Sequence, residues 1–231
     1  MITPRSASAH VFVADLERPQ LSAGDHHHVA RVLRLPPGTT VTASDGRGGW
    51  RPCRTTRSAA LEPSGEVVVD AVPAPPLTVA FALVKGERPE LIVQKLTELG
   101  IDRIVPFVAE RSVVRWDPPK VTRQAARLRE VARQAAMQCR RTHLPVVSEL
   151  TSFDAVAALD GATLADMAGA PVTDACRTVL VGPEGGWSER ERAVDLALVR
   201  LGDHVLRAET AAITAAALMS AIRGGAVRSA G

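Results

Sequence analysis

The stretch that decides the fold is TVLVGPEGGWSERE, which runs from Thr178 to Glu191. It begins with four β-branched or apolar residues, a pattern typical of a buried strand. Three glycines follow within five positions, and Ser188 with Glu191 three residues later forms a capping box, so a helix is expected to begin just after Trp187. A strand that turns through glycines into a helix indicates an α/β domain, in which ligands bind beyond the carboxyl ends of parallel strands.

Glycine-rich turns of this kind usually bind phosphate, but this one lacks the residues that grip it. No Lys-Ser or Lys-Thr pair follows the glycines, the spacing is not G-x-G-x-x-G, and Glu184 would repel an anion. A second turn of the same kind is predicted where a strand over HVLRA, residues 204–208, enters an alanine-rich helix that begins near Glu209 and stops at Gly224. Together the turns predict a pocket for a neutral or cationic small molecule. Either turn alone would favour a purely structural connection.

The rest of the chain predicts two domains. Residues 1–72 alternate short apolar runs with turn-rich pieces, which favours a small β-domain, and the prolines of VPAPP, residues 72–76, are typical of a linker. From residue 77 onward, strand patterns such as LTVAFALVK, IDRIVPFVA and ATLAD alternate with helical ones, which predicts a mainly parallel sheet. The longest helix is expected from Pro119 to Arg141, with a stripe of small and apolar residues at spacings of three and four.

Basic residues suggest a polyanionic partner. Residues 111–141 contain nine Lys or Arg and two acidic residues, although a solvated helix surface would show the same pattern. In DHHHVARVLRL, a helix capped by Asp25 would place His28, Arg31 and Arg34 near one face, which suits RNA, whereas consecutive histidines cannot all face one metal. An ordinary surface helix remains the alternative. DGRGGW, residues 45–50, is expected to be a hairpin turn, with Arg47 available to touch a phosphate.

Composition narrows the class of protein. The chain has 231 residues, 46% of them hydrophobic, and a formal net charge of +3. Its three cysteines, Cys53, Cys139 and Cys176, form no C-x-x-C pair, so we expect neither a disulfide framework nor a zinc finger. The N-terminus has no long apolar segment and no stretch is long enough to span a bilayer, so a cytoplasmic protein is expected.

LVGPEGGWSERE followed by LGDHVLRAETAAITA resembles the C-terminal signature of the RsmE family, SPOUT-superfamily methyltransferases that modify N3 of a uridine in small-subunit (16S) ribosomal RNA. QKLTELGIDRIVPFVAERS is similar to the central motif of that family, and HVARVLRLPPG to its N-terminal motif. One departure occurs in MQCRR, residues 137–141, where the family commonly has Glu-Gln-Ser-Gly-Arg. Met137 replaces the acidic residue, while Gln138 and Arg141 remain.

The resemblance implies an architecture and partners that composition could not show. It implies a PUA-like RNA-binding β-barrel over residues 1–72 and an α/β SPOUT methyltransferase domain with a deep trefoil knot over residues 77–231. It also implies S-adenosylmethionine as cofactor, ribosomal RNA or the small ribosomal subunit as partner, and a homodimer whose subunits together form the site. Neither a metal nor a membrane is required.

The expected site residues follow from the same motifs. Arg207 is the candidate for stabilising the developing anion on the uracil carbonyls, with Glu209 or Glu184 as proton acceptor, although either glutamate could instead only orient its loop. The expected cofactor-binding residues are Leu180, Val181, Gly182, Pro183, Glu184, Gly185, Gly186, Leu201, Gly202, Val205, Leu206, Arg207, Thr210 and Ala211. The expected RNA-binding residues are His28, Arg31, Arg34, Arg111, Arg115, Gln138 and Arg141.

Three alternatives stay open. The same pocket could serve a SPOUT methyltransferase that acts on another RNA nucleotide, on a ribose hydroxyl or on a transfer-RNA base. A non-catalytic RNA-binding or ribosome-assembly protein with a degenerate pocket is a second alternative, although the intact glycines argue against degeneracy. A dinucleotide-dependent oxidoreductase is disfavoured because G-x-G-x-x-G is absent.

Overall fold

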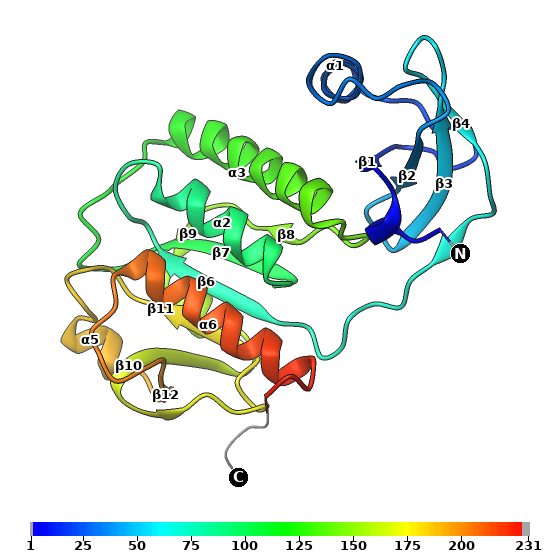
Figure 1. Cartoon of the computed structure of the whole chain (residues 1–231). Helices are drawn as coiled ribbons and strands as arrows, with labels where there is room; N and C mark the ends of the chain where they lie inside the picture. The colour runs from blue at the N-terminus through cyan, green and yellow to red at the C-terminus, as the bar shows by residue number, and fades with distance from the viewer. Residues whose placement is uncertain (1, 228–231) are drawn as a thin grey trace. The chain divides into compact units, whose positions relative to one another are not determined.

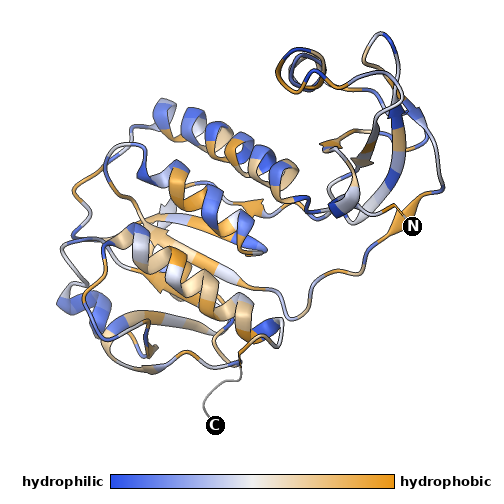
Figure 2. Ribbon diagram, in the orientation of Figure 1, coloured by the Kyte–Doolittle hydropathy of each residue, from blue (hydrophilic) through white to orange (hydrophobic). Residues whose placement is uncertain are grey.

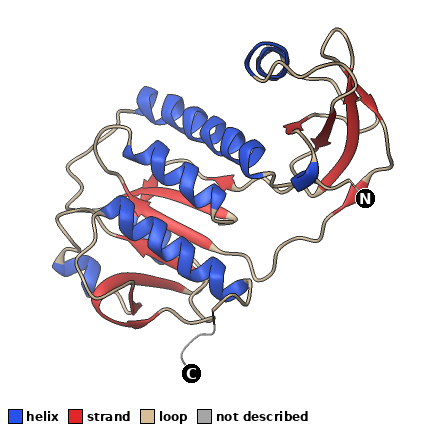
Figure 3. Ribbon diagram, in the orientation of Figure 1, coloured by secondary structure: helices blue, strands red, loops and turns tan. Residues whose placement is uncertain are grey.

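The residue pattern after the proline-rich linker produces a seven-stranded sheet whose strand pairs are all parallel. In the computed structural model, which describes residues 2–227, six strands follow the order β12-β10-β11-β6-β7-β8, and β9 pairs with β7 (Figures 1 and 3). The predicted α/β class with a mainly parallel sheet is therefore confirmed. The strands are β6 (Thr78–Ala82), β7 (Arg103–Val108), β8 (Val146–Val147), β9 (Thr151–Ser152), β10 (Ala162–Pro171), β11 (Thr178–Val181) and β12 (Ala197–Arg200).

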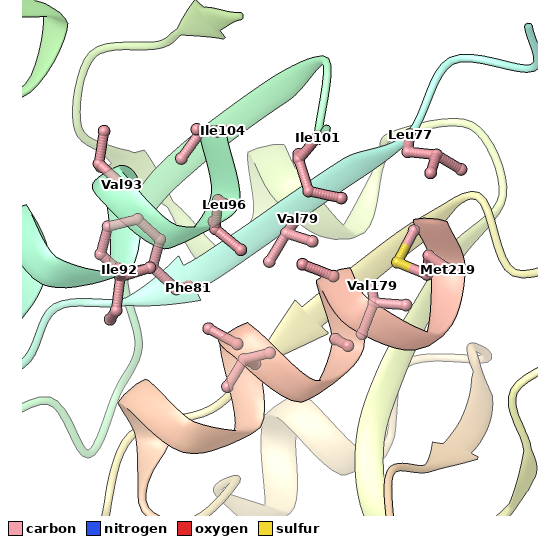
Figure 4. Packing of buried hydrophobic residues seen from close by; sticks show 14 of the residues in the cluster. Leu77, Val79, Phe81, Ile92, Val93, Leu96, Ile101, Ile104, Val179 and Met219 are labelled. Carbon is pink, nitrogen blue, oxygen red and sulfur yellow. The ribbon is translucent and has the colours of Figure 1, made fainter. Parts of the chain in front are cut away.

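Both faces of this sheet are covered, because its central strands β6, β7 and β11 are apolar at every position after the first. On β6, Val79 and Phe81 enter one hydrophobic cluster while Ala80 and Ala82 enter another. Figure 4 shows the first cluster, in which residues of β6 and β11 pack against α2 and α6. Apolar residues predominate along α6, whereas along α3 they alternate with hydrophilic residues (Figure 2). The helices are α2 (Arg88–Glu98), α3 (Pro118–Cys139), α4 (Phe153–Ala157), α5 (Glu189–Arg192) and α6 (Ala208–Arg223).

The chain forms two compact units. The first comprises residues 1–73 and 133–144, and the second comprises residues 74–132 and 145–231. The division after residue 73 lies within the expected linker, but the return of residues 133–144 to the first unit was not expected from the sequence. Arg133 forms an ion pair with Asp25, and Arg140 donates hydrogen bonds to carbonyl oxygens of residues 4, 7 and 8. These partners lie more than 100 residues away in sequence, so no local pattern could indicate them.

The first unit contains a five-stranded sheet in which β1 pairs parallel with β2 and the remaining pairs are antiparallel. Residues 45–48 connect β2 to β3, so the expected hairpin is confirmed, with Gly46 and Gly48 at positive φ. Met137 packs against the hydrophobic cluster of this unit. The elements are η1 (Pro4–Ser6), β1 (Ala9–Phe12), α1 (Ala23–His27), the π-helix η2 (His28–Val32), β2 (Thr40–Ser44), β3 (Gly49–Thr55), β4 (Leu61–Pro63) and β5 (Val68–Val69).

The structure corrects two local expectations in this unit. The N-cap of α1 is Ser22, not Asp25, because the Ser22 hydroxyl accepts the Asp25 N–H while the Asp25 carboxylate pairs with Arg133. His28, Arg31 and Arg34 do not share one helical face, since the helix widens into a π-helix at His28 and Arg34 lies beyond its end with φ of 50°.

The strand expected over HVLRA was wrong. The last strand lies earlier, at Ala197–Arg200, where Val199 is buried and pairs with β10. Residues 201–207 form an irregular connection, and the Val205 side chain is 87% exposed. The run at residues 197–200 pairs with the edge of β10 that β11 leaves open. The helix that follows ends at Arg223 with Gly224 as its C-cap, so its predicted stop is confirmed.

Candidate functional site

The first bend of the site connects β11 to α5 through residues 182–188. The predicted capping box is present, because the Ser188 hydroxyl accepts the Glu191 N–H and the Glu191 carboxylate accepts the Ser188 N–H. Glu191 is fully buried, and its second oxygen accepts the N–H of Glu110 at 2.8 Å. Glu191 thus ties this bend to the loop that follows β7, so the carboxyl ends of two strands are linked.

Trp187 forms the floor of this bend. Its ring is buried, stacks on Phe107 with centroids 6.2 Å apart, and donates a hydrogen bond from Nε1 to the carbonyl of Ala165. Gly182 lies against the ring, since a Cβ at that position would stand 3.0 Å from the nearest Trp187 carbon. This glycine is therefore required for close approach to an aromatic side chain.

The second bend, residues 201–207, connects β12 to α6. Arg207 is the N-cap of α6, but its side chain makes no capping bond and is exposed. The bend contains Gly202, where a Cβ would meet no atom within 4 Å, and an exposed His204. The second bend is therefore held mainly by its two ends, the strand β12 and the helix α6.

Each of the two bends forms one side of a cavity of about 310 Å³. This size is within the range of small-molecule sites. Its wall is mainly apolar, with Asp166, Glu184, Arg192 and His204 as the polar side chains. Most of the expected cofactor-binding residues line it: Val181, Gly182, Pro183, Glu184, Gly186, Leu201, Gly202, Val205, Leu206 and Ala211. The wall also includes Ala165, Asp166, Met167, Trp187, Arg192, His204 and Ala208, which sequence reasoning missed.

Four expected residues lie outside this wall. Leu180 points into the hydrophobic cluster on the α4 side of the sheet, as alternation along β11 requires. Gly185 accepts a hydrogen bond from Arg111 through its carbonyl oxygen. Arg207 and Thr210 are exposed beside lining residues of α6 and the second bend.

Arg88, at the start of α2, contacts both candidate proton acceptors. Its Nη1 donates to Glu184 Oε1 at 2.8 Å, and its Nε lies 3.7 Å from Glu209 Oε1. Glu209 Oε2 is buried and, within the described part of the chain, has no hydrogen-bond partner. Sequence reasoning missed Arg88, although its position at the start of the helix that follows a central parallel strand is a signal that could have identified it.

A second ion pair lies in the wall of the cavity. Arg192 of α5 forms an ion pair with Asp166, with Nη1 2.8 Å from Oδ2, and the Asp166 side chain is only 11% exposed. Because Asp166 neutralises Arg192, the polar part of the wall offers no guanidinium without a carboxylate partner. The wall therefore suits a neutral or cationic molecule better than a phosphate, as the sequence predicted.

The expected RNA-binding residues are mostly at the surface of their units. His28, Arg31, Arg34 and Gln138 are exposed in the first unit, and Arg111 and Arg115 are exposed in the second. Arg141 is partly buried and donates to the carbonyl of His143. Other arginines of the basic stretch have structural partners: Arg127 pairs with Glu90, and Arg129 with Glu149. The basic stretch is therefore only in part a free cationic surface.

Within residues 2–227, no group of three or more His, Cys, Asp and Glu side chains is arranged to hold a metal ion. Of the consecutive histidines, His26 is engaged through Nε2 with the carbonyl of Ser58. Among the helices of the same residues, none combines the length and apolar character needed to cross a membrane.

Similarity to known proteins identifies the class to which the second unit belongs. A family model described as an RNA methyltransferase domain matches residues 72–220, which include both bends and the cavity, so the second unit is a domain of this class. A solved structure of a ribosomal RNA small subunit methyltransferase E from Neisseria gonorrhoeae, bound to S-adenosylmethionine, is 26% identical, has a TM-score of 0.78, and is matched over 93% of this chain and 97% of its own. A protein from Legionella pneumophila, described as a methyltransferase and solved with the same cofactor, is 25% identical with a TM-score of 0.80 over 92% of this chain and 96% of its own.

A relative by sequence makes the assignment more specific. The ribosomal RNA small subunit methyltransferase E of Mycobacterium bovis is 34% identical over 212 residues, which cover 81% of this chain and 80% of the relative. The chain belongs to the RsmE family of RNA methyltransferases.

Proposed function

We propose that the protein is an S-adenosylmethionine-dependent methyltransferase that methylates N3 of a uridine in 16S ribosomal RNA. The observation that carries the proposal is the cavity between the two bends at the carboxyl edge of a parallel sheet, the place where open α/β sheets bind ligands. Membership of the RsmE family and the cofactor held by the solved relatives support the choice of ligand.

The residues present fit this cofactor. The apolar wall with Trp187 and Leu206 suits an adenosine, and the carboxylates of Asp166 and Glu184 suit a molecule with amino and sulfonium cations. Among residues 2–227, the buried Oε2 of Glu209 has no hydrogen-bond partner. In the sequence Glu209 lies between Ala208 and Ala211, both of which line the cavity. When bound there, S-adenosylmethionine supplies an electrophilic methyl group on a sulfonium. The residues that would hold it are the lining residues of both bends.

Uracil N3 carries a proton at neutral pH, so it becomes a nucleophile only when that proton leaves and the negative charge on the carbonyl oxygens is stabilised. The exposed guanidinium of Arg207 is available to donate to those oxygens, because its chain neighbours Leu206 and Ala208 line the cavity while its own side chain faces solvent. Glu184 and Glu209 remain the candidate proton acceptors.

RNA would be held by the exposed basic residues of each unit. In the first unit, the residues that would contact the RNA are His28, Arg31, Arg34, Gln138 and Arg141. In the second unit they are Arg111 and Arg115. Such contacts predict an affinity for ribosomal RNA that falls as the salt concentration rises.

The finer architecture is part of the proposal. We assign the first unit to a PUA-like barrel, the second to a SPOUT domain with a trefoil knot, and the whole to a cytoplasmic homodimer that requires no metal. Family membership and the five-stranded sheet of the first unit support these assignments. Light scattering of the purified protein tests the dimer, since a monomeric mass would contradict it.

The catalytic assignment is tested by Arg207→Ala. We expect methyl transfer to be lost while the dissociation constant for S-adenosylmethionine changes by less than about tenfold, or about 1.4 kcal/mol, because the Arg207 side chain lies outside the cavity wall. Transfer is measured with labelled cofactor and unmethylated small subunits, and binding by calorimetry. Full activity in the variant would remove Arg207 from the chemistry.

Two measurements separate the proposed reaction from its alternatives. Nucleoside mass spectrometry of ribosomal RNA from a deletion strain should show the loss of N3-methyluridine, whereas the loss of another modified nucleoside would indicate a different target. Calorimetry of the wild-type protein with S-adenosylmethionine should give a saturable heat. No heat would favour a non-catalytic RNA-binding protein.

A further inference from the structure

We infer that Arg88 is a positioning residue that fixes the distance between the two bends of the cofactor cavity by holding Glu184 and Glu209 on one guanidinium. This inference rests on the proposed function, because it concerns how the cavity is kept ready for S-adenosylmethionine. The residues come from three separate parts of the second unit: Arg88 from the start of α2, Glu184 from the first bend, and Glu209 from the first turn of α6.

The sheet by itself does not connect the two bends directly. The first bend follows β11 and the second follows β12, and in the strand order β10 lies between these two strands. Ladder hydrogen bonds therefore fix each bend only where its own strand ends, and the seven-residue connection after β12 has no regular structure. The packing of α6 on β11 links the bends indirectly, and a contact between side chains adds a direct link between them.

The geometry of Arg88 meets this need. Its Nη1 is 2.8 Å from Glu184 Oε1 and its Nε is 3.7 Å from Glu209 Oε1, so two edges of one planar group face two carboxylates. Without the guanidinium that both carboxylates contact, their two negative charges would be left without a shared cation and would repel each other. Of these three side chains, Glu184 alone lines the cavity within the described residues, so Arg88 acts through its partners and not on the ligand.

Burial indicates which of the two contacts matters more. The Glu184 side chain is 45% exposed, and an ion pair at such a site contributes little to stability. The Glu209 side chain is 14% exposed, and its Oε2 is buried without a partner in the described part of the chain. A carboxylate in that position depends on its remaining charge partner, so loss of Arg88 would force Glu209 to move toward water.

The same contacts give both glutamates a role in the free protein. Each carboxylate has one oxygen directed at Arg88, which makes loop anchoring the first function of Glu184 and Glu209. Any proton transfer by either glutamate would have to occur through the other oxygen.

The test compares Arg88→Met, which removes the charge and keeps the length, with Arg88→Lys, which keeps the charge without the planar fork. We expect Arg88→Met to weaken S-adenosylmethionine binding by tenfold or more in calorimetry, and Arg88→Lys to recover part of the loss. The KM for the cofactor should rise in steady-state assays, while the KM for RNA stays unchanged. Arg127→Met is the matched control, because it breaks another Arg–Glu pair of the second unit, at the surface, and should bind the cofactor as the wild type does.

A double variant tests whether Arg88 acts through Glu209. In a Glu209→Gln background, the effect of Arg88→Met on cofactor affinity should shrink at least threefold, since the neutral amide no longer needs the guanidinium. Purely additive effects, or wild-type affinity in Arg88→Met, would overturn the inference. If Arg88→Met is unfolded by circular dichroism, the comparison moves to Arg88→Lys, for which wild-type affinity and KM would equally overturn it. Failure of the wild-type protein to bind S-adenosylmethionine would instead refute the proposed function.

Discussion

Replacing His10 by Gln should remove a large part of the acid sensitivity of the first unit. His10 is 2% exposed, and its Nε2 lies 3.0 Å from the carbonyl oxygen of Arg141 while its Nδ1 lies 2.8 Å from the Thr42 hydroxyl. Because a carbonyl can only accept, Nε2 carries the proton and Nδ1 accepts from Thr42, which is the neutral tautomer. The pKa of His10 is lowered from 6.5 to about 4, mainly because burial disfavours the charged ring. The nearby Arg140 charge acts in the same direction, whereas the bond to the Arg141 carbonyl and the charge of Asp70 oppose the shift.

The sign and size of the effect follow from linkage. Between pH 6.5 and 4 the unfolded chain binds a proton at His10 that the folded chain excludes, so the free energy of unfolding falls as the pH falls through this window. The difference between the two pKa values corresponds to about 3 kcal/mol over the whole window, and to about 2 kcal/mol by pH 5. Gln keeps a donor and an acceptor but does not titrate, so the variant should lose this part of the pH dependence.

Urea denaturation at pH 7.5 and pH 5 measures the effect in both proteins. Every other titrating group is common to wild type and variant, so the difference between their pH slopes isolates His10. A nuclear magnetic resonance titration of the His10 ring gives its pKa directly. Parallel loss of stability in both proteins, or a His10 midpoint near 6.5, would refute the reasoning.

Two further substitutions test the packing of the bends by urea denaturation. Gly182→Ala should lower the free energy of unfolding by about 1–3 kcal/mol, because the new Cβ would stand 3.0 Å from the Trp187 ring. The control is Gly202→Ala, whose new Cβ meets no atom within 4 Å and should lower the free energy of unfolding by less than about 1 kcal/mol. Equal losses in the two variants would contradict the predicted contact. Glu191→Ala should cost about 2–3 kcal/mol, since it removes the capping box and leaves two backbone N–H groups without their acceptor. The exposed Glu189 of the same turn is the control, and a similar cost for Glu189→Ala would show that helix propensity, not capping, is responsible.

The sequence alone determined the features that depend on neighbouring residues. Short, nearly continuous apolar runs predicted most strands of the parallel sheet, because such strands are covered on both faces. The sequence also predicted the capping box of Ser188 and Glu191 and the end of α6 at Gly224, since the residues that interact there lie within three or four positions of each other. The resemblance of the motifs identified the correct family and most of the residues that line the cavity.

Only the tertiary structure decided features that depend on distant partners. Val199, not Val205, joined the sheet, because one edge of β10 is already paired with β11 and one further strand pairs with its other edge. The two runs are too alike for local patterns to rank. Residues 133–144 joined the first unit through contacts made across more than 100 positions. Arg88 contacts Glu184 across 96 positions and Glu209 across 121 positions (209 − 88), so only the folded structure shows that it links the two bends. The physical reason is that an ion pair depends on distance in space, which a one-dimensional pattern does not encode.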